Sequence, residues 1–174
     1  MNHAKIGLAL AASLIGLSAF AQSGPTDPQI AGIVVTANKI DVDAGKLAKS
    51  HTKNKEVSKF AQLMITDHTA VNKQAGALAK KLSVKPEDSD TSKSLKAGAA
   101  ENVKNLKGLK GAAFDKAYVD HEVVYHQAVL DAIDKVLIPN AKNAELKDLI
   151  VKVRPAIAAH LDHAKMVQSD LAKK

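Results

Sequence analysis

Long segments of the sequence carry apolar side chains at alternating spacings of four and three residues. The most regular run holds Val57, Ala61, Met64, His68, Val71, Ala75, Leu78 and Leu82. Residues at this spacing share one face of an α-helix, whereas a half-buried strand alternates with a period of two. Almost no segment alternates in that way, and aromatic residues make up only 3% of the chain. The pattern predicts an all-α fold.

Turn-forming residues divide the chain into five predicted helices. Four are long and amphipathic, and the third is shorter and less apolar; they span about 28–51, 54–82, 92–109, 112–137 and 143–171. Pro139 is expected to stop the fourth helix, and Pro155 to kink or start a helix one turn before His160. We therefore predict a four-helix bundle with a short extra connecting helix, in one domain over residues 22–174.

Residues 1–21 have the features of a secretory signal peptide. Lys5 supplies the basic start, an apolar run covers residues 6–17, and Ala19 and Ala21 form a small-x-small cleavage signature. We expect cleavage after about Ala21 and a periplasmic mature protein. The apolar run is shorter than the span of about 20 residues that a bilayer requires, so no transmembrane segment is expected.

Composition narrows the classes of partner and ligand. The chain has no cysteine, so any metal ligands are His and carboxylate. The formal net charge is +7, but the lysines are scattered and stacking aromatics are few, which argues against a nucleic-acid partner. A weak contact with an anionic envelope surface stays open, and the sequence identifies no protein partner.

Five titratable residues interrupt the apolar stripes. Glu122 and His126 lie in the segment "YVDHEVVYHQAV", among valines, tyrosines and an alanine that otherwise resemble one buried helix face. Each of the other long helices also contributes at least one, giving the inward set Asp41, His68, Glu122, His126 and His160. Asp115 also falls on a stripe, near the start of the fourth helix.

Distance from the turns predicts whether these groups meet. At a rise of about 1.5 Å per residue, Asp41 and His68 lie about 18 and 22 Å from the turn near Lys53, while Glu122, His126 and His160 lie about 21 to 30 Å from the turn near Asn140. If both turns are at the same end of the bundle, the five groups form one layer. If the short helix spans the full height, the layer is expected to split into two pairs.

A buried layer of His and carboxylate has two interpretations. Imidazole nitrogen and carboxylate oxygen suit a transition metal ion such as Zn, Cu, Fe or Ni, with Asp41, His68, Glu122, His126 and His160 as candidate ligands. Alternatively, the layer is a hydrogen-bond network in a non-catalytic envelope or stress-related structural protein. An enzyme ranks third, because the sequence has no nucleophile elbow, phosphate-binding loop or His-Glu-x-x-His motif.

Several motifs over residues 33–167 resemble those of a bacterial family. They comprise an acidic residue on the first helix, an Asp-His pair, a Phe-Asp-x-x-Tyr motif, a helix histidine and a Pro-x-x-x-x-His motif; these are Asp41, Asp67–His68, Phe114–Asp115 with Tyr118, His126, and Pro155 with His160. The chain resembles domain-of-unknown-function family 4142, exported proteins grouped with the ferritin-like fold.

The resemblance implies a ferritin-like four-helix bundle in the periplasm and supplies no reaction. Di-iron proteins of that fold use paired Glu-x-x-His motifs with two further glutamates. This chain has Glu-x-x-x-His at Glu122 and His126 and no Glu-x-x-His. A di-iron oxidase or ferroxidase is therefore disfavoured.

Overall fold

The computed structural model describes residues 24–173, and the predicted signal peptide lies outside them. The helices are α1 (Asp27–His51), α2 (Lys55–Lys81), α3 (Asp90–Lys107), α4 (Gly111–Ala132), the π-helical turn η1 (Ile133–Leu137), α5 (Ile138–Asn140) and α6 (Ala144–Leu171). No strand occurs between residues 24 and 173, so the predicted all-α fold is confirmed. Within the same range, no helix has a stretch long and apolar enough to cross a bilayer.

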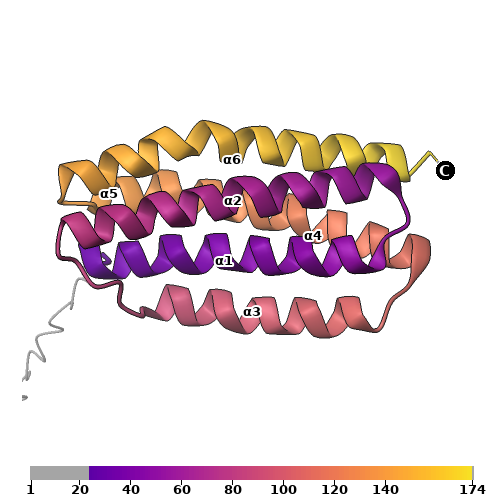
Figure 1. The fold of residues 1–174 in the computed structure, drawn as a ribbon, viewed down its shortest axis with the longest axis horizontal. Coiled ribbons are helices and arrows are strands. Elements are labelled where there is room, and N and C mark those ends of the chain that lie inside the picture. Colours follow the sequence, from indigo (N-terminus) through magenta and orange to yellow (C-terminus); the bar gives the residue numbers. More distant parts are fainter. Residues whose placement is uncertain (1–23, 174) are drawn as a thin grey trace, which may run out of the picture.

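Four of the helices pack side by side as a bundle. Helix α1 packs along α2 and α4 packs along α6, while α3 lies against α1 and α4 on the outside (Figure 1). Helix α3 is 18 residues long and runs along most of the bundle. The connecting helix therefore returns the chain across nearly the full height.

The direction of α3 corrects one expectation. The turn after α1 and the turn before α6 lie at opposite ends of the bundle (Figure 1), not at the same end. The predicted split into two pairs is nevertheless wrong, because each of the five inward residues lies near the middle of a helix. In helices about 40 Å long, a position about 20 Å from one end is also about 20 Å from the other.

Side-chain caps and one cross-link fix the helix ends. Asn54, the N-cap of α2, accepts hydrogen bonds from the backbone N–H groups of Glu56 and Val57 at 3.0 and 3.4 Å. Asp27, in the first turn of α1, accepts from the backbone N–H groups of Lys142 and Asn143 at 2.8 and 2.9 Å. The start of α1 is thereby tied to the turn before α6.

Two prolines behave differently from the expectation. Pro139 does not stop the fourth helix, because the chain widens into the π-helical turn η1 and continues to Asn140. In that turn the N–H of Ile138 donates to the carbonyl of Ile133, five residues back. Helix α6 runs unbroken through Pro155, so the prediction that a helix starts at Pro155 is wrong. Figure 1 shows that α6 is bowed along its length.

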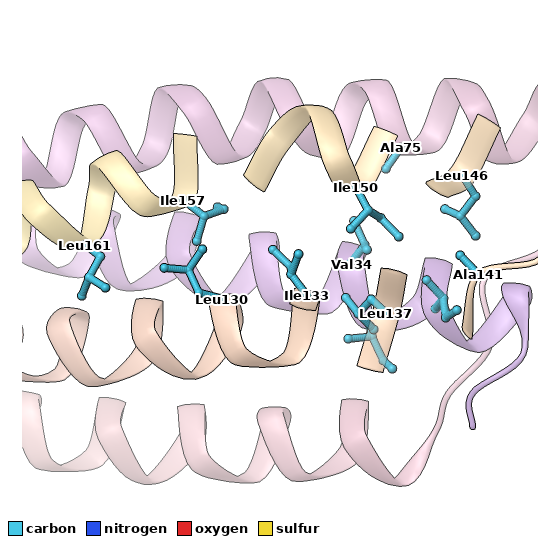
Figure 2. Close-up of a cluster of buried hydrophobic side chains, with 12 residues drawn as sticks. Val34, Ala75, Leu130, Ile133, Leu137, Ala141, Leu146, Ile150, Ile157 and Leu161 are labelled. Carbon is cyan, nitrogen blue, oxygen red and sulfur yellow. The ribbon is translucent and has the colours of Figure 1, made fainter. Parts of the chain in front are cut away.

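Two apolar clusters fill the bundle on either side of the polar layer. The first, drawn in Figure 2, contains Ile30, Ile33, Val34, Ala75, Leu130, Ile133, Leu137, Ala141, Leu146, Ile150, Ile157 and Leu161. The second contains Ala44, Ala48, Val57, Phe60, Ala61, Met64, Leu106, Phe114, Tyr118, Val119, Ala164 and Val167. Their burial is the main stabilising contribution to helices of this kind, and the layer between them is buried as well.

Gly32 is where the segment between α2 and α3 touches α1. The N–H of Glu87 donates to the carbonyl of Pro28 at 2.9 Å. A Cβ atom on Gly32 would lie 1.9 Å from the carbonyl oxygen of Glu87, closer than any non-bonded contact allows. Only glycine lets this segment lie directly on the helix.

We predict that Gly32→Ala lowers the free energy of unfolding by about 1 to 3 kcal/mol, because the Glu87 backbone must move away. Gly98→Ala is the matched control, since a Cβ atom there meets nothing within 4 Å. In a helix interior that change stabilises by up to about 1 kcal/mol. Urea unfolding of both variants checks the pair, and equal effects would contradict the proposed contact.

Candidate metal centre

The five predicted site residues come together in one buried layer. Their exposed fractions lie between 0% and 4%, and they come from four helices: Asp41 from α1, His68 from α2, Glu122 and His126 from α4, and His160 from α6. Asp115 is buried as predicted, but it lies near the start of α4, where it lines a surface pocket with Lys53 and Lys110, outside this layer.

The three histidines face one another. Their ring centroids are 5.1 Å apart for His68 and His160, 5.6 Å for His126 and His160, and 5.7 Å for His68 and His126. One ring nitrogen from each lies within 4.8 Å of the others. A single ion between the rings would therefore lie within reach of all three after small shifts of the side chains.

Asn38 fixes the tautomer of His68. The Nδ2 group of Asn38 donates to the carbonyl of Val34 at 2.7 Å, which leaves its Oδ1 as the atom that faces His68. That oxygen can only accept, so Nδ1 of His68 donates to it, at 2.7 Å. The lone pair of His68 is thus on Nε2, which has no hydrogen-bond partner among the described residues.

The other two histidines are held in the same way. His126 donates from Nδ1 to the backbone carbonyl of Glu122 at 2.9 Å, and His160 donates from Nε2 to the Asp67 carboxylate at 2.9 Å. Within residues 24–173, the second nitrogen of each ring, Nε2 of His126 and Nδ1 of His160, is buried without a partner. Donation from one ring nitrogen to an oxygen is the arrangement that orients a metal-binding histidine.

Burial keeps His68 and His126 neutral. It lowers the pKa of His68 to about 3, with further lowering by the charges of His126 and His160. It also lowers the pKa of His126 to about 4, against the opposing effect of the hydrogen bond to Glu122. Neutral imidazoles present lone pairs, and lone pairs cannot hydrogen-bond to one another. A cation between them would satisfy every ring nitrogen left without a partner.

Two carboxyl groups complete the layer. Asp41 Oδ2 lies 3.5 Å from His68 Nε2, and Glu122 Oε2 lies 3.5 Å from His126 Nδ1. Asp41, Glu122 and His126 also place ligand atoms within 4.8 Å of one another. Burial raises the pKa of Glu122 to about 8, and burial together with the Glu122 charge raises that of Asp41 well above its usual range. Burial therefore favours the protonated forms of both carboxyl groups, and a bound cation would oppose that effect.

Two tyrosines border the carboxyl pair. Tyr125 donates from its hydroxyl to the carbonyl of Ala37 at 3.2 Å. Tyr118 is fully buried, and its hydroxyl has no partner within the described range. Burial, with the charges of Glu122 and Asp41, raises the pKa of Tyr118 well above its usual value. Tyr118 therefore stays neutral and shields the carboxyl side of the layer from water.

Helical periodicity did not identify Asn38 and Asp67, the side chains that orient His68 and His160. Asn38 belongs to a second four-three run on α1, with Val34, Asp41 and Gly45, and that run was the signal for it. Asp67 lies on the half-exposed side of α2, next to His68 in the chain, and only the family resemblance pointed to it. His121 flanks the layer, with Nδ1 3.9 Å from Glu122 Oε1.

Comparison with known proteins gives one match. A family model described as "Domain of unknown function (DUF4142)" matches residues 16–167. No curated protein and no solved structure matches the chain.

We predict that His68 and His126 of the metal-free protein stay neutral down to about pH 5, with their protons on Nδ1. An unfolded imidazole titrates near 6.5, so these side chains contribute fully to folding stability above that pH. The contribution falls as pH drops from 6.5 toward 4 and 3, where the folded groups titrate. Nitrogen NMR of the histidine rings measures both properties; midpoints near 6.5 or protons on Nε2 would contradict the geometry.

Proposed function

The chain belongs to the DUF4142 family, and we propose that it binds one transition-metal ion through His68, His126 and His160. One observation carries the proposal: each ring is anchored through one nitrogen, and its other nitrogen is buried among the three without a partner within residues 24–173. Leaving a buried polar atom unpaired costs about 1 to 3 kcal/mol, so three in contact need a ligand.

The donor set favours a particular class of metal. Imidazole nitrogen suits Zn, Cu, Ni and Fe, whereas Ca and Mg prefer oxygen. Asp41 and Glu122 form a second group of candidate ligands with His126, so these carboxylates are the candidates for a further ligand once a proton leaves. A metal held by three histidines can supply Lewis-acid chemistry at an open position, but the proposal is of binding and assigns no reaction.

The rival function is a structural protein whose polar layer is a hydrogen-bond network. One observation favours it: a protonated Asp41 can donate to His68, whose Nε2 lies 3.5 Å from Oδ2. Such a bond leaves Nε2 of His126 and Nδ1 of His160 without partners among the described residues. The network interpretation therefore accounts for one of the three free nitrogens.

We further propose that the protein is exported and acts in the periplasm. This rests on the sequence of residues 1–21, with its basic start, short apolar run and small residues at positions 19 and 21. Intact-mass measurement of the protein expressed from the full sequence is expected to give a chain that starts near Gln22 in the periplasmic fraction. A chain that retains residues 1–21 would contradict export.

We predict that Zn²⁺ or Cu²⁺ added to the metal-free protein raises its melting temperature and binds with a stoichiometry of one. His126→Ala is expected to weaken binding by about a hundredfold or more, because it removes one of three ligands. His163→Ala is the control, since that residue packs against Phe60 outside the layer. Isothermal titration calorimetry measures the affinities. A wild-type protein that no tested ion stabilises would refute the proposal in favour of the network.

We predict that Asn38→Ala weakens metal binding by about 10- to 100-fold without removing a ligand, because His68 loses the acceptor that orients its ring. Asn38→Asp keeps an acceptor oxygen at the same place and is expected to restore most of the affinity. Unchanged binding in Asn38→Ala would show that the orientation of His68 does not matter for the metal.

A further inference from the structure

A cavity of about 100 Å³ lies next to the candidate metal centre. Its wall is almost entirely aliphatic and includes Ile33, Val34, Leu95, Val129, Ile133 and Leu137. Figure 2 shows the side chains of Val34, Ile133, Leu137 and Ile150 pointing into the same space between the helices. The π-helical turn η1 supplies part of this wall, and turns of this kind are frequent at functional sites.

The cavity ends at the polar layer. Asn38, Asp41 and His68 are the polar side chains that line its inner end. Asp41 is 3% exposed, and its Oδ2 lies 3.5 Å from Nε2 of His68. A molecule in the cavity therefore meets the Asp41 carboxyl group at the inner end, the polar side chains of Tyr125 and Thr91 along the wall, and hydrocarbon over most of the remainder.

The other end of the cavity reaches the surface between α3 and α4. Thr91 on α3 and Ala128 on α4 both line it, and both are exposed. The buried residues of α3 are only Ser92 and Leu106, so this helix is held less firmly than the four helices of the bundle. The opening of the cavity thus lies beside α3, at the exposed Thr91 and Ala128.

We propose that this cavity binds a small, neutral, mainly apolar molecule with one hydrogen-bond-donating group, which points at Asp41. The size fits this class, because an apolar cavity of about 150 Å³ stays dry and takes up benzene or xenon. Binding in the cavity stands apart from the metal.

The test uses cyclopentanol and cyclopentane with the metal-free protein. Both probes are expected to produce saturable NMR shifts at lining residues such as Leu95 and Ile133. Cyclopentanol is expected to bind about tenfold more tightly, because its hydroxyl reaches the Asp41 carboxyl group. Equal affinities would overturn the polar end of the proposal, and no saturable shift with either probe would overturn the site.

Two substitutions on opposite walls of the cavity, each of which fills part of its volume, test whether the probes bind there. Ala37→Leu on α1 and Ala132→Leu on α4 each place extra carbon in the space and are expected to weaken both probes by about tenfold or more. Ala100→Leu on the exposed face of α3 is the matched control. Two variants keep the test valid if one of them does not fold, and binding that survives in a folded filling variant would overturn the proposal.

The outcome separates this inference from the proposed function. Probe binding that persists while Zn²⁺ fails to bind would refute the metal site and leave the cavity intact. Zn²⁺ binding without any probe binding would refute the cavity site and leave the proposed metal site intact. Since the probes are titrated in metal-free protein, neither result depends on the other.

Discussion

The structure depends on three buried imidazoles that are each anchored by one nitrogen and left open at the other. Asn38, the carbonyl of Glu122 and Asp67 decide which nitrogen carries the proton on His68, His126 and His160. Once those protons are placed, the remaining lone pairs are on Nε2 of His68, Nε2 of His126 and Nδ1 of His160, all buried without a partner among the described residues. A polar arrangement of this kind is costly in an apolar core, and it persists only where other interactions of the fold oppose the cost.

The apolar clusters above and below the layer provide that opposition. Each long helix of the bundle passes through both clusters and contributes to the polar layer between them, so the layer cannot open without separating packed side chains. The same enclosure explains the electrostatics. Burial disfavours every charged form at once, which lowers the pKa of His68 and His126 and raises that of Asp41 and Glu122. Burial consequently favours the neutral form of each of these four groups, and a cation would favour the ionised carboxylates.

Helical periodicity predicted much of this from sequence alone. The four-three spacing identified the inward residues, Asp41 and His68 among them, because a long helix presents one face to the core whatever its neighbours are. It could not reveal Asp67, which orients His160 from the half-exposed edge of α2. Helical periodicity also could not predict the direction of α3 or the continuation of the helix through Pro139, because both depend on contacts between helices.

The layer and the neighbouring cavity share a wall at Asn38, Asp41 and His68, so a metal and a small molecule would meet at one place. The most direct test of the metal centre is a crystal structure of the metal-loaded protein with anomalous diffraction at the metal edge. The account predicts one peak, about 2.0 to 2.1 Å from Nε2 of His68, Nε2 of His126 and Nδ1 of His160, if the metal is zinc. A peak elsewhere, or bonds to the nitrogens that now donate to Asn38, Glu122 and Asp67, would contradict it.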